Sequence, residues 1–333
     1  CDRRTVPRHT PSHPLSPNPK RRCHPQPART DPKEALIENR ATLMGIAGIL
    51  CWSLMIGLLR ATMNAFGSEL GGALVYTVGA VLLFLVNRPT PLRRLSSKFL
   101  LVSGAFFVSY EVLLALAVGL AASPAQTLEV SMLNYLWPTF TVLLWALFGG
   151  DGRGASFLRV LPGAVVATIG VALAVGGQDL IARGSAFAEF FVNPAPYVLA
   201  GVAALLWGLY NTVTPKVSDG GNAIAYFFTA VAIALWAVFF AKGAPLPAAF
   251  EPADLVPLIA TAAAVAAGYA LWGHAIVRGD MRVLSISSYA TPVLSTIATT
   301  IILTATPGPV FWVGAALVVI GSIASWIGSQ KAR

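Results

Sequence analysis

Ten runs of predominantly apolar residues, each about 20 residues long, follow one another along this chain. A run of this length crosses the hydrocarbon core of a bilayer as an α-helix. Only helices and closed barrels satisfy backbone hydrogen bonds in lipid, and these runs are too long and too uniform for barrel strands. The sequence therefore predicts an all-α integral membrane protein with ten transmembrane helices, at residues 41–60, 67–86, 99–120, 126–148, 157–176, 195–214, 222–241, 255–277, 283–304 and 309–328.

The composition supports this fold class and excludes others. The chain is 56% hydrophobic and 11% charged, whereas soluble domains are about 25% charged. A net charge of +9 would fit a nucleic-acid binder, but an excess of basic residues on one side of a membrane explains it better, so we expect no nucleic-acid partner. The tail residues Cys1, His9, His13, Cys23 and His24 match no standard metal spacing. We expect neither a metal nor a cofactor.

Residues 1–40 differ from the rest of the chain. They are rich in Pro, Arg, His and Ser and contain few large apolar residues, which predicts a disordered, basic, cytosolic tail. The chain starts at Cys1, and its first methionine is Met44. We therefore expect that part of this tail is foreign to the natural protein. Mass spectrometry that found residues 1–30 intact in cells would disprove this.

The basic residues of the short loops predict the orientation in the membrane. One set of loops and the C-terminus carry eleven Lys and Arg, and the other set carries only Arg60, Arg183 and Lys242. Cytoplasmic loops carry the excess of Lys and Arg in membrane proteins. The sequence therefore predicts a multi-pass membrane protein with both termini in the cytoplasm.

The fourth and ninth apolar runs contain a proline at the same internal position, because Pro292 follows Pro138 by 154 residues. At this offset Ser131, Asn134 and Tyr135 match Ser285, Ser288 and Tyr289. Similar offsets relate residues 52–54 to 207–209 and the glycine pair 163/170 to 314/321. We predict two five-helix repeats, at 41–177 and 195–328. Because five is odd, the second is inverted, an arrangement typical of secondary transporters that bind substrate near the bilayer midplane.

The two prolines lack a backbone N–H, so they free the carbonyl groups of Asn134 and Ser288. A freed carbonyl in lipid must find another partner. One interpretation is a structural kink whose carbonyl is satisfied by a neighbouring side chain. For two prolines at matching places in polar helices, we favour a hinge that lines a central cavity.

These features together resemble the EamA-type drug/metabolite transporter superfamily: ten spans in two repeats, Tyr-x-x-Pro in spans four and nine, and G-x6-G in spans five and ten. The resemblance covers about residues 41–328. The runs Leu133-Asn-Tyr-Leu-Trp-Pro138 and Ser287-Ser-Tyr-Ala-Thr-Pro292 are most similar to the aromatic amino acid exporters of that superfamily. Many members have a glutamate directly after spans four and nine. Here residues 149–151 and 304–307 contain none, so a role for such glutamates is not expected.

The polar and aromatic residues within the spans supply the candidate substrate site. Aromatic rings can stack on an apolar side chain and attract an ammonium group, although Trp and Tyr also gather at membrane interfaces. Glu111 near the middle of span three is costly in lipid, and it is either a partner for a substrate amino group or proton, or a carboxyl bonded to a neighbouring helix. The predicted central-cavity residues are Trp52, Tyr110, Glu111, Asn134, Tyr135, Trp137, Trp207, Tyr210, Asn211, Tyr269, Trp272, His274, Ser288 and Tyr289.

Three classes of function compete for such a chain. We favour a secondary transporter that works by alternating access and exports amino acids, aromatic and other neutral ones, with cationic drugs or other small metabolites as the alternative cargo. An intramembrane enzyme is disfavoured because the sequence contains no HExxH, GxSxG or paired carboxylates. A receptor without flux is disfavoured by the repeat. No ATP-binding motif occurs, so a solute gradient or a coupled ion such as a proton drives transport. We expect a monomer or a weak homodimer in the lipid bilayer.

Overall fold

The computed structural model describes residues 32–148, 153–183, 187–218, 220–244, 246 and 251–330. All regular elements within these ranges are helices, which confirms the predicted all-α class. The first half of the chain forms α1 (Pro32–Phe66), α2 (Ser68–Val86), the 3₁₀ helix η1 (Leu92–Arg94), α3 (Ser97–Leu120), α4 (Pro124–Asn134), α5 (Trp137–Phe148) and α6 (Arg153–Arg183). The second half forms α7 (Ala188–Val192), α8 (Ala195–Val217), α9 (Ile224–Lys242), η2 (Pro252–Asp254), α10 (Leu255–Arg278), α11 (Met281–Ser288), α12 (Thr291–Ile302) and α13 (Pro309–Gln330).

The structure does not confirm all ten predicted spans. Among the described residues, nine helical segments are long and apolar enough to cross a membrane. The difference lies at the predicted ninth span, 283–304, which is divided into α11 and α12. α12 is apolar but only 12 residues long. The predicted fourth span is divided as well, into α4 and α5.

Both divisions fall at matching positions. α4 ends and α5 begins at Asn134 and Trp137, and α11 ends and α12 begins 154 positions further along. Pro138 and Pro292 each occupy the second position of the new half-helix, where the missing N–H removes no intrahelical hydrogen bond. The predicted kinks are therefore breaks, and each proline lies in the first turn of a second helix.

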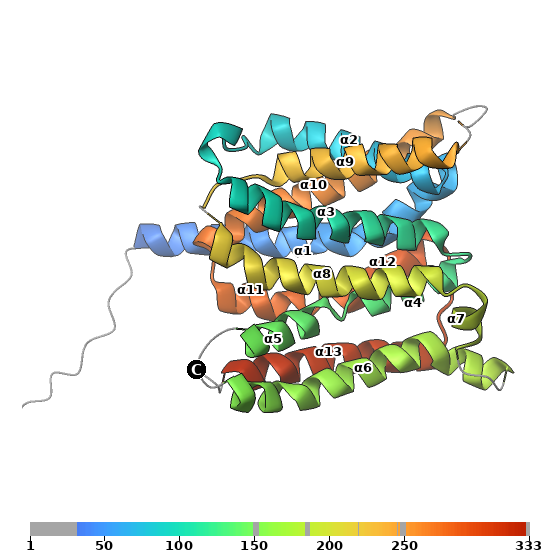
Figure 1. Ribbon diagram of the computed structural model, residues 1–333. Helices are drawn as coiled ribbons and strands as arrows, with labels where there is room; N and C mark the ends of the chain where they lie inside the picture. The colour runs from blue at the N-terminus through green and yellow to red at the C-terminus, as the bar shows by residue number, and fades with distance from the viewer. Residues whose placement is uncertain are drawn as a thin grey trace, which may run out of the picture.

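Helices from the two halves of the chain lie side by side (Figure 1). The main pairs are α1 with α10, α2 with α9, α3 with α8 and α6 with α13. The broken spans also contact the opposite half, since α5 packs on α8 and α12 on α1. In Figure 1, α1, α3 and α6 run from left to right, whereas α8, α10 and α13 run from right to left. Each main pair is therefore antiparallel.

The α6–α13 pair is held together at glycines. A Cβ atom built on Gly163 would lie 2.5 Å from the carbonyl oxygen of Gly321. A Cβ on Gly170 would lie 2.7 Å from the carbonyl oxygen of Gly314. No side chain fits at such distances, so glycine at these positions is what allows the two backbones to approach.

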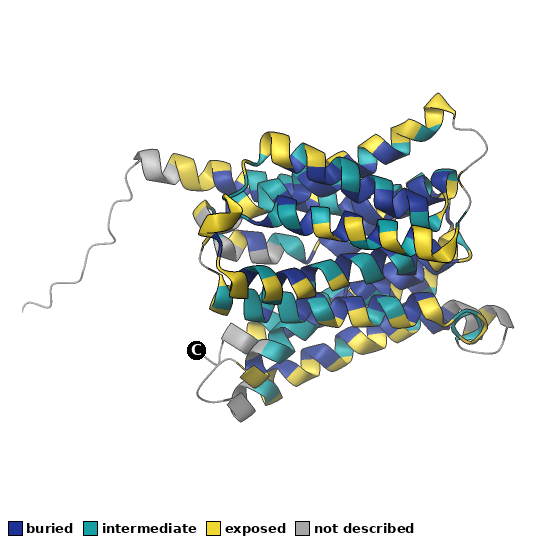
Figure 2. Ribbon diagram, turned by 45° about the horizontal axis from the view of Figure 1, so that its top comes forward, coloured by how far each residue is buried: buried dark blue, intermediate teal, exposed yellow. Residues whose placement is uncertain are grey.

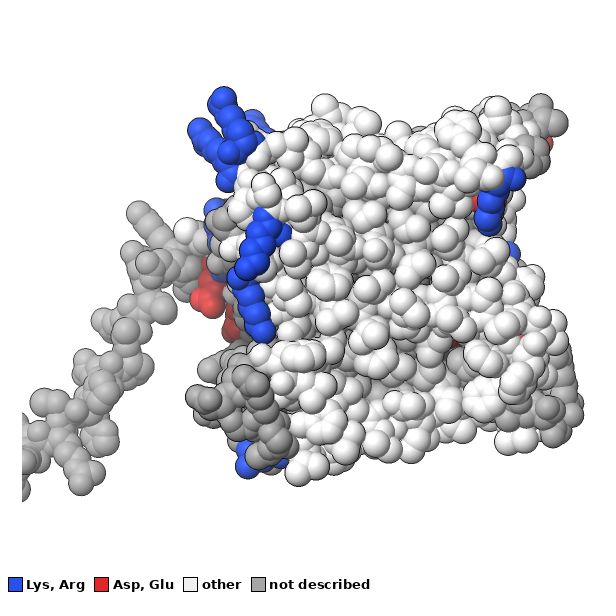
Figure 3. Space-filling model, in the orientation of Figure 1, with Lys and Arg blue, Asp and Glu red and all other residues white. Residues whose placement is uncertain are grey.

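The outer surface of the helices is apolar. Large hydrophobic side chains are exposed along it, such as Leu85, Leu101 and Phe240, each more than 70% exposed. Figure 2 shows exposed positions on the outer faces of helices whose inner faces are buried. The view in Figure 3 is almost free of charge across its middle, with Lys and Arg gathered at the side where α1 begins and α13 ends. This pattern suits a protein embedded in lipid.

The ends of the helices extend the predicted repeats. α1 begins at Pro32, so residues 32–40 are helical rather than part of an irregular tail. α6 continues to Arg183, beyond the predicted repeat end at residue 177. The predicted disorder of residues 1–31 lies outside the described residues, as do Cys1, Cys23 and the tail histidines.

Candidate functional site

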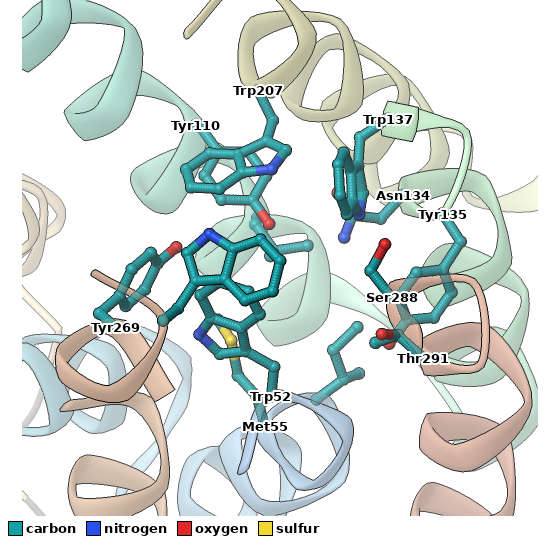
Figure 4. A pocket seen from close by; sticks show the side chains of 13 residues that line it. Trp52, Met55, Tyr110, Asn134, Tyr135, Trp137, Trp207, Tyr269, Ser288 and Thr291 are labelled. Atoms are coloured by element: carbon teal, nitrogen blue, oxygen red, sulfur yellow. The ribbon is translucent and has the colours of Figure 1, made fainter. Parts of the chain in front are cut away.

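A cavity at the centre of the helices is walled by aromatic rings (Figure 4). α1, α3, α4, α5, α8 and α10 to α12 each contribute to it. The lining residues are Trp52, Met55, Ile56, Tyr110, Leu114, Asn134, Tyr135, Trp137, Trp207, Tyr269, Trp272, Ser288 and Thr291. We call this space the central cavity. Nine of its thirteen residues belong to the set predicted from the sequence.

The rings around the central cavity contact one another. The ring centroid of Trp207 lies 4.6 Å from that of Tyr110 and 6.3 Å from that of Trp137, at interplanar angles of 34° and 89°. Trp52 packs on Tyr269 at 5.1 Å and on Trp272 at 5.3 Å. Edge and tilted contacts of this kind leave part of each ring face uncovered, and such faces can stack on another aromatic ring.

Two polar atoms of the central cavity are buried without a hydrogen-bond partner. They are Nε1 of Trp52, a donor, and Oδ1 of Asn134, an acceptor. Buried polar groups are normally hydrogen-bonded, so each such exception needs an explanation. A bound molecule with one acceptor group and one donor group would satisfy both atoms.

The central cavity is small in this structure. Its volume of about 50 Å³ has room for one or two water molecules, each of which occupies about 30 Å³ in the liquid. An aromatic amino acid is larger than this. Binding one therefore requires space beyond the central cavity itself.

A second, wider cavity adjoins the first and has a volume of about 230 Å³. Both cavities share Trp52, Trp137, Trp207, Trp272 and Ser288. The second is further lined by Pro138, Thr141, Val142, Asn211, Tyr289 and Trp326. Asn211 on α8 and Trp326 on α13 lie in the C-terminal halves of those helices, which end on the side where α1 begins, and α5 runs from the break toward the same side (Figure 1). We call it the terminal-side cavity.

Glu111 lines neither cavity, although the sequence predicts it among the central-cavity residues. Its carboxylate is fully buried and accepts hydrogen bonds from the hydroxyl groups of Tyr76, at 2.5 Å, and Tyr269. These tyrosines belong to α2 and α10, so the geometry matches the interpretation of a carboxyl bonded to neighbouring helices. Only Tyr269 reaches the central cavity. Any influence of Glu111 on that cavity passes through Tyr269.

Tyr210 and His274 also lie outside both cavities. The ring of Tyr210 stacks on Trp207, with centroids 4.9 Å apart, and so supports a cavity wall from behind. Nδ1 of His274 lies 3.0 Å from Nη1 of Arg278, one turn further along α10. The other predicted residues, Asn211 and Tyr289, line the terminal-side cavity together with Pro138. Pro292 lines neither cavity.

Sequence reasoning missed several lining residues. Met55, Ile56 and Leu114 are ordinary apolar residues in their helices, so nothing in the sequence distinguishes them from lipid-facing ones. Thr141 and Thr291 do carry a signal, because both lie on or next to the polar stripes of the broken spans. Trp326 is close to a span end, where an interfacial tryptophan is expected, but it lines the terminal-side cavity.

Comparison with known proteins gives related sequences over most of the chain. The model of the EamA-like transporter family matches residues 195–327. The aromatic amino acid exporter YddG of Salmonella typhimurium (strain 14028s / SGSC 2262) is 35% identical over 298 residues, which cover 89% of this chain and all of that protein. The aromatic amino acid exporter YddG of Escherichia coli (strain K12) is 34% identical, with the same coverage of both chains.

Two more distant proteins also match this chain over most of its length. The aromatic amino acid exporter YddG of Ancylobacter novellus is 26% identical over 85% of this chain and 96% of its own. A solved crystal structure superposes with a TM-score of 0.61 at 23% identity and covers 88% of this chain and 99% of its own. At that identity the superposition supports the fold alone.

Proposed function

Because this chain belongs to the EamA-like drug/metabolite transporter superfamily, we propose that it is a secondary transporter that exports aromatic and other neutral amino acids across the bacterial inner membrane. The relatives of 34% and 35% identity carry the name of aromatic amino acid exporters and match this chain over their whole length. They are transporters rather than enzymes. The cargo is proposed here from the chemistry of the central cavity.

The observation that carries the proposal is the pair of unpartnered polar atoms inside the aromatic wall. The indole N–H of Trp52 can donate to an α-carboxylate, and Oδ1 of Asn134 can accept from an α-ammonium group. The breaks also bring the backbone ends of four half-helices to the cavity, because Asn134, Trp137, Ser288 and Thr291 all line it. The rings of Tyr110, Trp137 and Trp207 offer faces to an aromatic side chain.

The same residues disfavour a cationic drug as cargo. Among the described residues, neither cavity is lined by Asp, Glu, Lys or Arg. An organic cation would enter without a carboxylate to balance its charge, since Glu111 is engaged with Tyr76 and Tyr269. A zwitterion carries its own balancing charge, so a neutral lining with one donor and one acceptor suits it better.

We infer that the two halves are inverted repeats, and the helix contacts support this. If each helix of the first half is replaced by its counterpart in the second half, and the reverse, the α1–α10 pair becomes the α8–α3 pair. In the same way the α5–α8 contact becomes the α12–α1 contact. The α2–α9 and α6–α13 pairs remain the same two pairs after this exchange. The glycines obey the same rule, because Gly163 meets Gly321 while its counterpart Gly314 meets Gly170.

Alternating access follows from this symmetry. The wider cavity lies toward the side where the basic residues gather, which we assign to the cytoplasm by the positive-inside rule. The structure then corresponds to a form that is wider toward the cytoplasm. We propose a monomer or a weak homodimer that is driven by the solute gradient or by a coupled proton.

Counterflow in proteoliposomes tests the proposal. Purified protein is reconstituted, the vesicles are loaded with one unlabelled amino acid at a time, and entry of labelled phenylalanine is followed. We expect accumulation with aromatic amino acids inside, less with small neutral ones, and none with a cationic drug. Exchange with drugs but not with amino acids, from protein shown to be folded, would overturn the cargo and leave the fold.

A further inference from the structure

The second half of the ninth span, α12, carries a polar face that the cavities do not explain. Ser295, Thr296 and Thr299 are fully buried within this apolar helix. The hydroxyl groups of Thr296, Thr299 and Thr300 have no hydrogen-bond partner among the described residues. At 100° per residue, positions 295, 296, 299 and 300 cover one side of α12. We call these four residues the α12 hydroxyl face.

Threonines elsewhere in the protein behave differently. The hydroxyl groups of Thr62, Thr77, Thr141, Thr212 and Thr229 all donate to the backbone carbonyl four residues before them. This local bond is the usual way for a helix to satisfy a hydroxyl in an apolar setting. Thr296, Thr299 and Thr300 of α12 make no such bond. A local hydrogen bond therefore does not account for the burial of these hydroxyl groups, and another explanation is needed.

The position of the α12 hydroxyl face in the fold suggests an explanation for these unpartnered hydroxyl groups. α12 begins at the central cavity, where Thr291 is a lining residue, and runs toward the side opposite the one where α1 begins (Figure 1). At the repeat offset of 154, Ser295 and Thr296 correspond to Thr141 and Val142 on α5. Those two residues line the wide terminal-side cavity. The corresponding space beside α12 is filled by packed helices, chiefly α1.

We propose that the α12 hydroxyl face lines the second half of the translocation path, which leads from the central cavity to the opposite membrane face and is closed in this structure. This inference rests on the proposed transport function. The unpartnered hydroxyls are hydrated and contact the polar groups of an amino acid when α1 and α12 separate. In the closed form they lose these partners, which disfavours permanent closure.

Gly57 on α1 is the contact that closes this half of the path. A Cβ atom built on Gly57 would lie 3.0 Å from Cα of Thr299 and 3.2 Å from its hydroxyl oxygen. Glycine therefore permits α1 to rest directly on the α12 hydroxyl face. A methyl group at this position would crowd the contact and favour the separated form.

Cysteine accessibility tests the path. In a background with Cys1, Cys23 and Cys51 replaced by serine, Thr299→Cys is compared with Ile297→Cys, whose native side chain is 43% exposed on the opposite, outward face of α12. A membrane-impermeant, sulfonate-bearing thiosulfonate is added from the side opposite the termini, with phenylalanine present. Because a thiol reacts as the hydrated thiolate, we expect Thr299→Cys to react at least about tenfold faster than Ile297→Cys.

A labelling experiment without any amino acid separates this inference from the proposed function. Gly57→Ala combined with Thr299→Cys should raise the labelling rate severalfold without any amino acid present. If labelling is fast but phenylalanine counterflow is absent, the path stands and the cargo is wrong. If Thr299→Cys stays as slow as Ile297→Cys in both the Gly57 and the Gly57→Ala proteins, the path is overturned, whatever the cargo.

The double variant Thr296→Val/Thr299→Val gives a second readout. Valine has nearly the same shape as threonine but lacks the hydroxyl. If the face is only structural, loss of unpartnered hydroxyls should raise the unfolding temperature and leave counterflow unchanged. We expect the unfolding temperature to rise and counterflow to fall severalfold. An unchanged counterflow rate in the stabilised variant would overturn the proposal.

Discussion

The two broken spans have the same local design and different surroundings. Each stops at the same register, and each restarts with proline at the second position. On α5, Thr141 donates to the carbonyl of Trp137, lies 3.4 Å from the amide of Asn211 and lines the terminal-side cavity. On α12, Thr299 is buried against Gly57 without a partner. The matching sequence at the two breaks therefore determines where the helices end, whereas tertiary packing determines which side is wide.

The largest effect should come from the α6–α13 contact, which belongs equally to both halves. A Cβ atom on Gly321 would lie 2.3 Å from the backbone nitrogen of Ala167, and a backbone atom cannot move aside cheaply. We expect Gly321→Val to destabilise the protein by more than about 3 kcal/mol and to remove most of the folded material. Size-exclusion chromatography of the fluorescently tagged protein in detergent measures this.

Gly273→Val is the matched control for that experiment. A Cβ atom on Gly273 meets no atom within 4 Å, and the residue is exposed. It should give a profile like that of the unchanged protein. Normal recovery of Gly321→Val would show that the α6–α13 contact is looser than the structure shows.

The second-largest effect, on transport, is expected from substitutions at two equivalent positions, one at each break. Trp137 and Thr291 both begin a second half-helix and both line the central cavity, but only Trp137 presents a ring. We expect Trp137→Ala to lower phenylalanine counterflow about tenfold, which corresponds to about 1.4 kcal/mol of lost interaction. Thr291→Ala should lower it much less. Equal losses in the two folded variants would show that the break itself, rather than the ring, sets the rate.

Glu111 gives a smaller and more specific test, because it belongs to the first half and accepts one bond from each half. We expect Glu111→Gln to flatten any pH dependence of counterflow, measured between pH 5.5 and 8.5, since the amide does not titrate over this range. Glutamine can keep the contacts with Tyr76 and Tyr269, so the fold should persist. An unchanged pH profile would leave Glu111 with a structural role only.

The two tyrosines that hold Glu111 provide an internal control. Tyr269 lines the central cavity and Tyr76 does not, although both donate to the same carboxylate. Tyr269→Phe should therefore reduce counterflow severalfold more than Tyr76→Phe, while both lower the unfolding temperature. Similar transport in the two variants would argue against control of the cavity through Tyr269.

Much of this arrangement can be predicted from the sequence for physical reasons. Length and hydropathy predict the spans, and the repeated Tyr-x-x-Pro predicts the position of both breaks. Aromatic residues in mid-span predict most of the central cavity, because large polar-edged rings rarely face the middle of a bilayer. The helical start at Pro32 could not be predicted, because the residues there have no apolar pattern.

The sequence could not show toward which neighbour each side chain points around its helix. Glu111 lies one residue after Tyr110, yet Tyr110 lines the central cavity and Glu111 faces α2 and α10. Residues one apart differ by 100° around a helix, so only the packing of neighbours decides which of them reaches a cavity. For the same reason the unpartnered state of Thr299 is visible only in the folded protein.

The smallest effects should come from the prolines themselves. Each proline stands in the first turn of a half-helix, so Pro138→Ala and Pro292→Ala lose no hydrogen bond and should change stability by less than about 1 kcal/mol. The two variants should unfold at nearly the same temperature. Pro138 lines the terminal-side cavity whereas Pro292 lines neither cavity, so any loss of counterflow should be confined to Pro138→Ala. Loss of folded protein in either variant would mean that the break depends on proline itself, and unequal unfolding temperatures would mean that the two breaks are not equivalent.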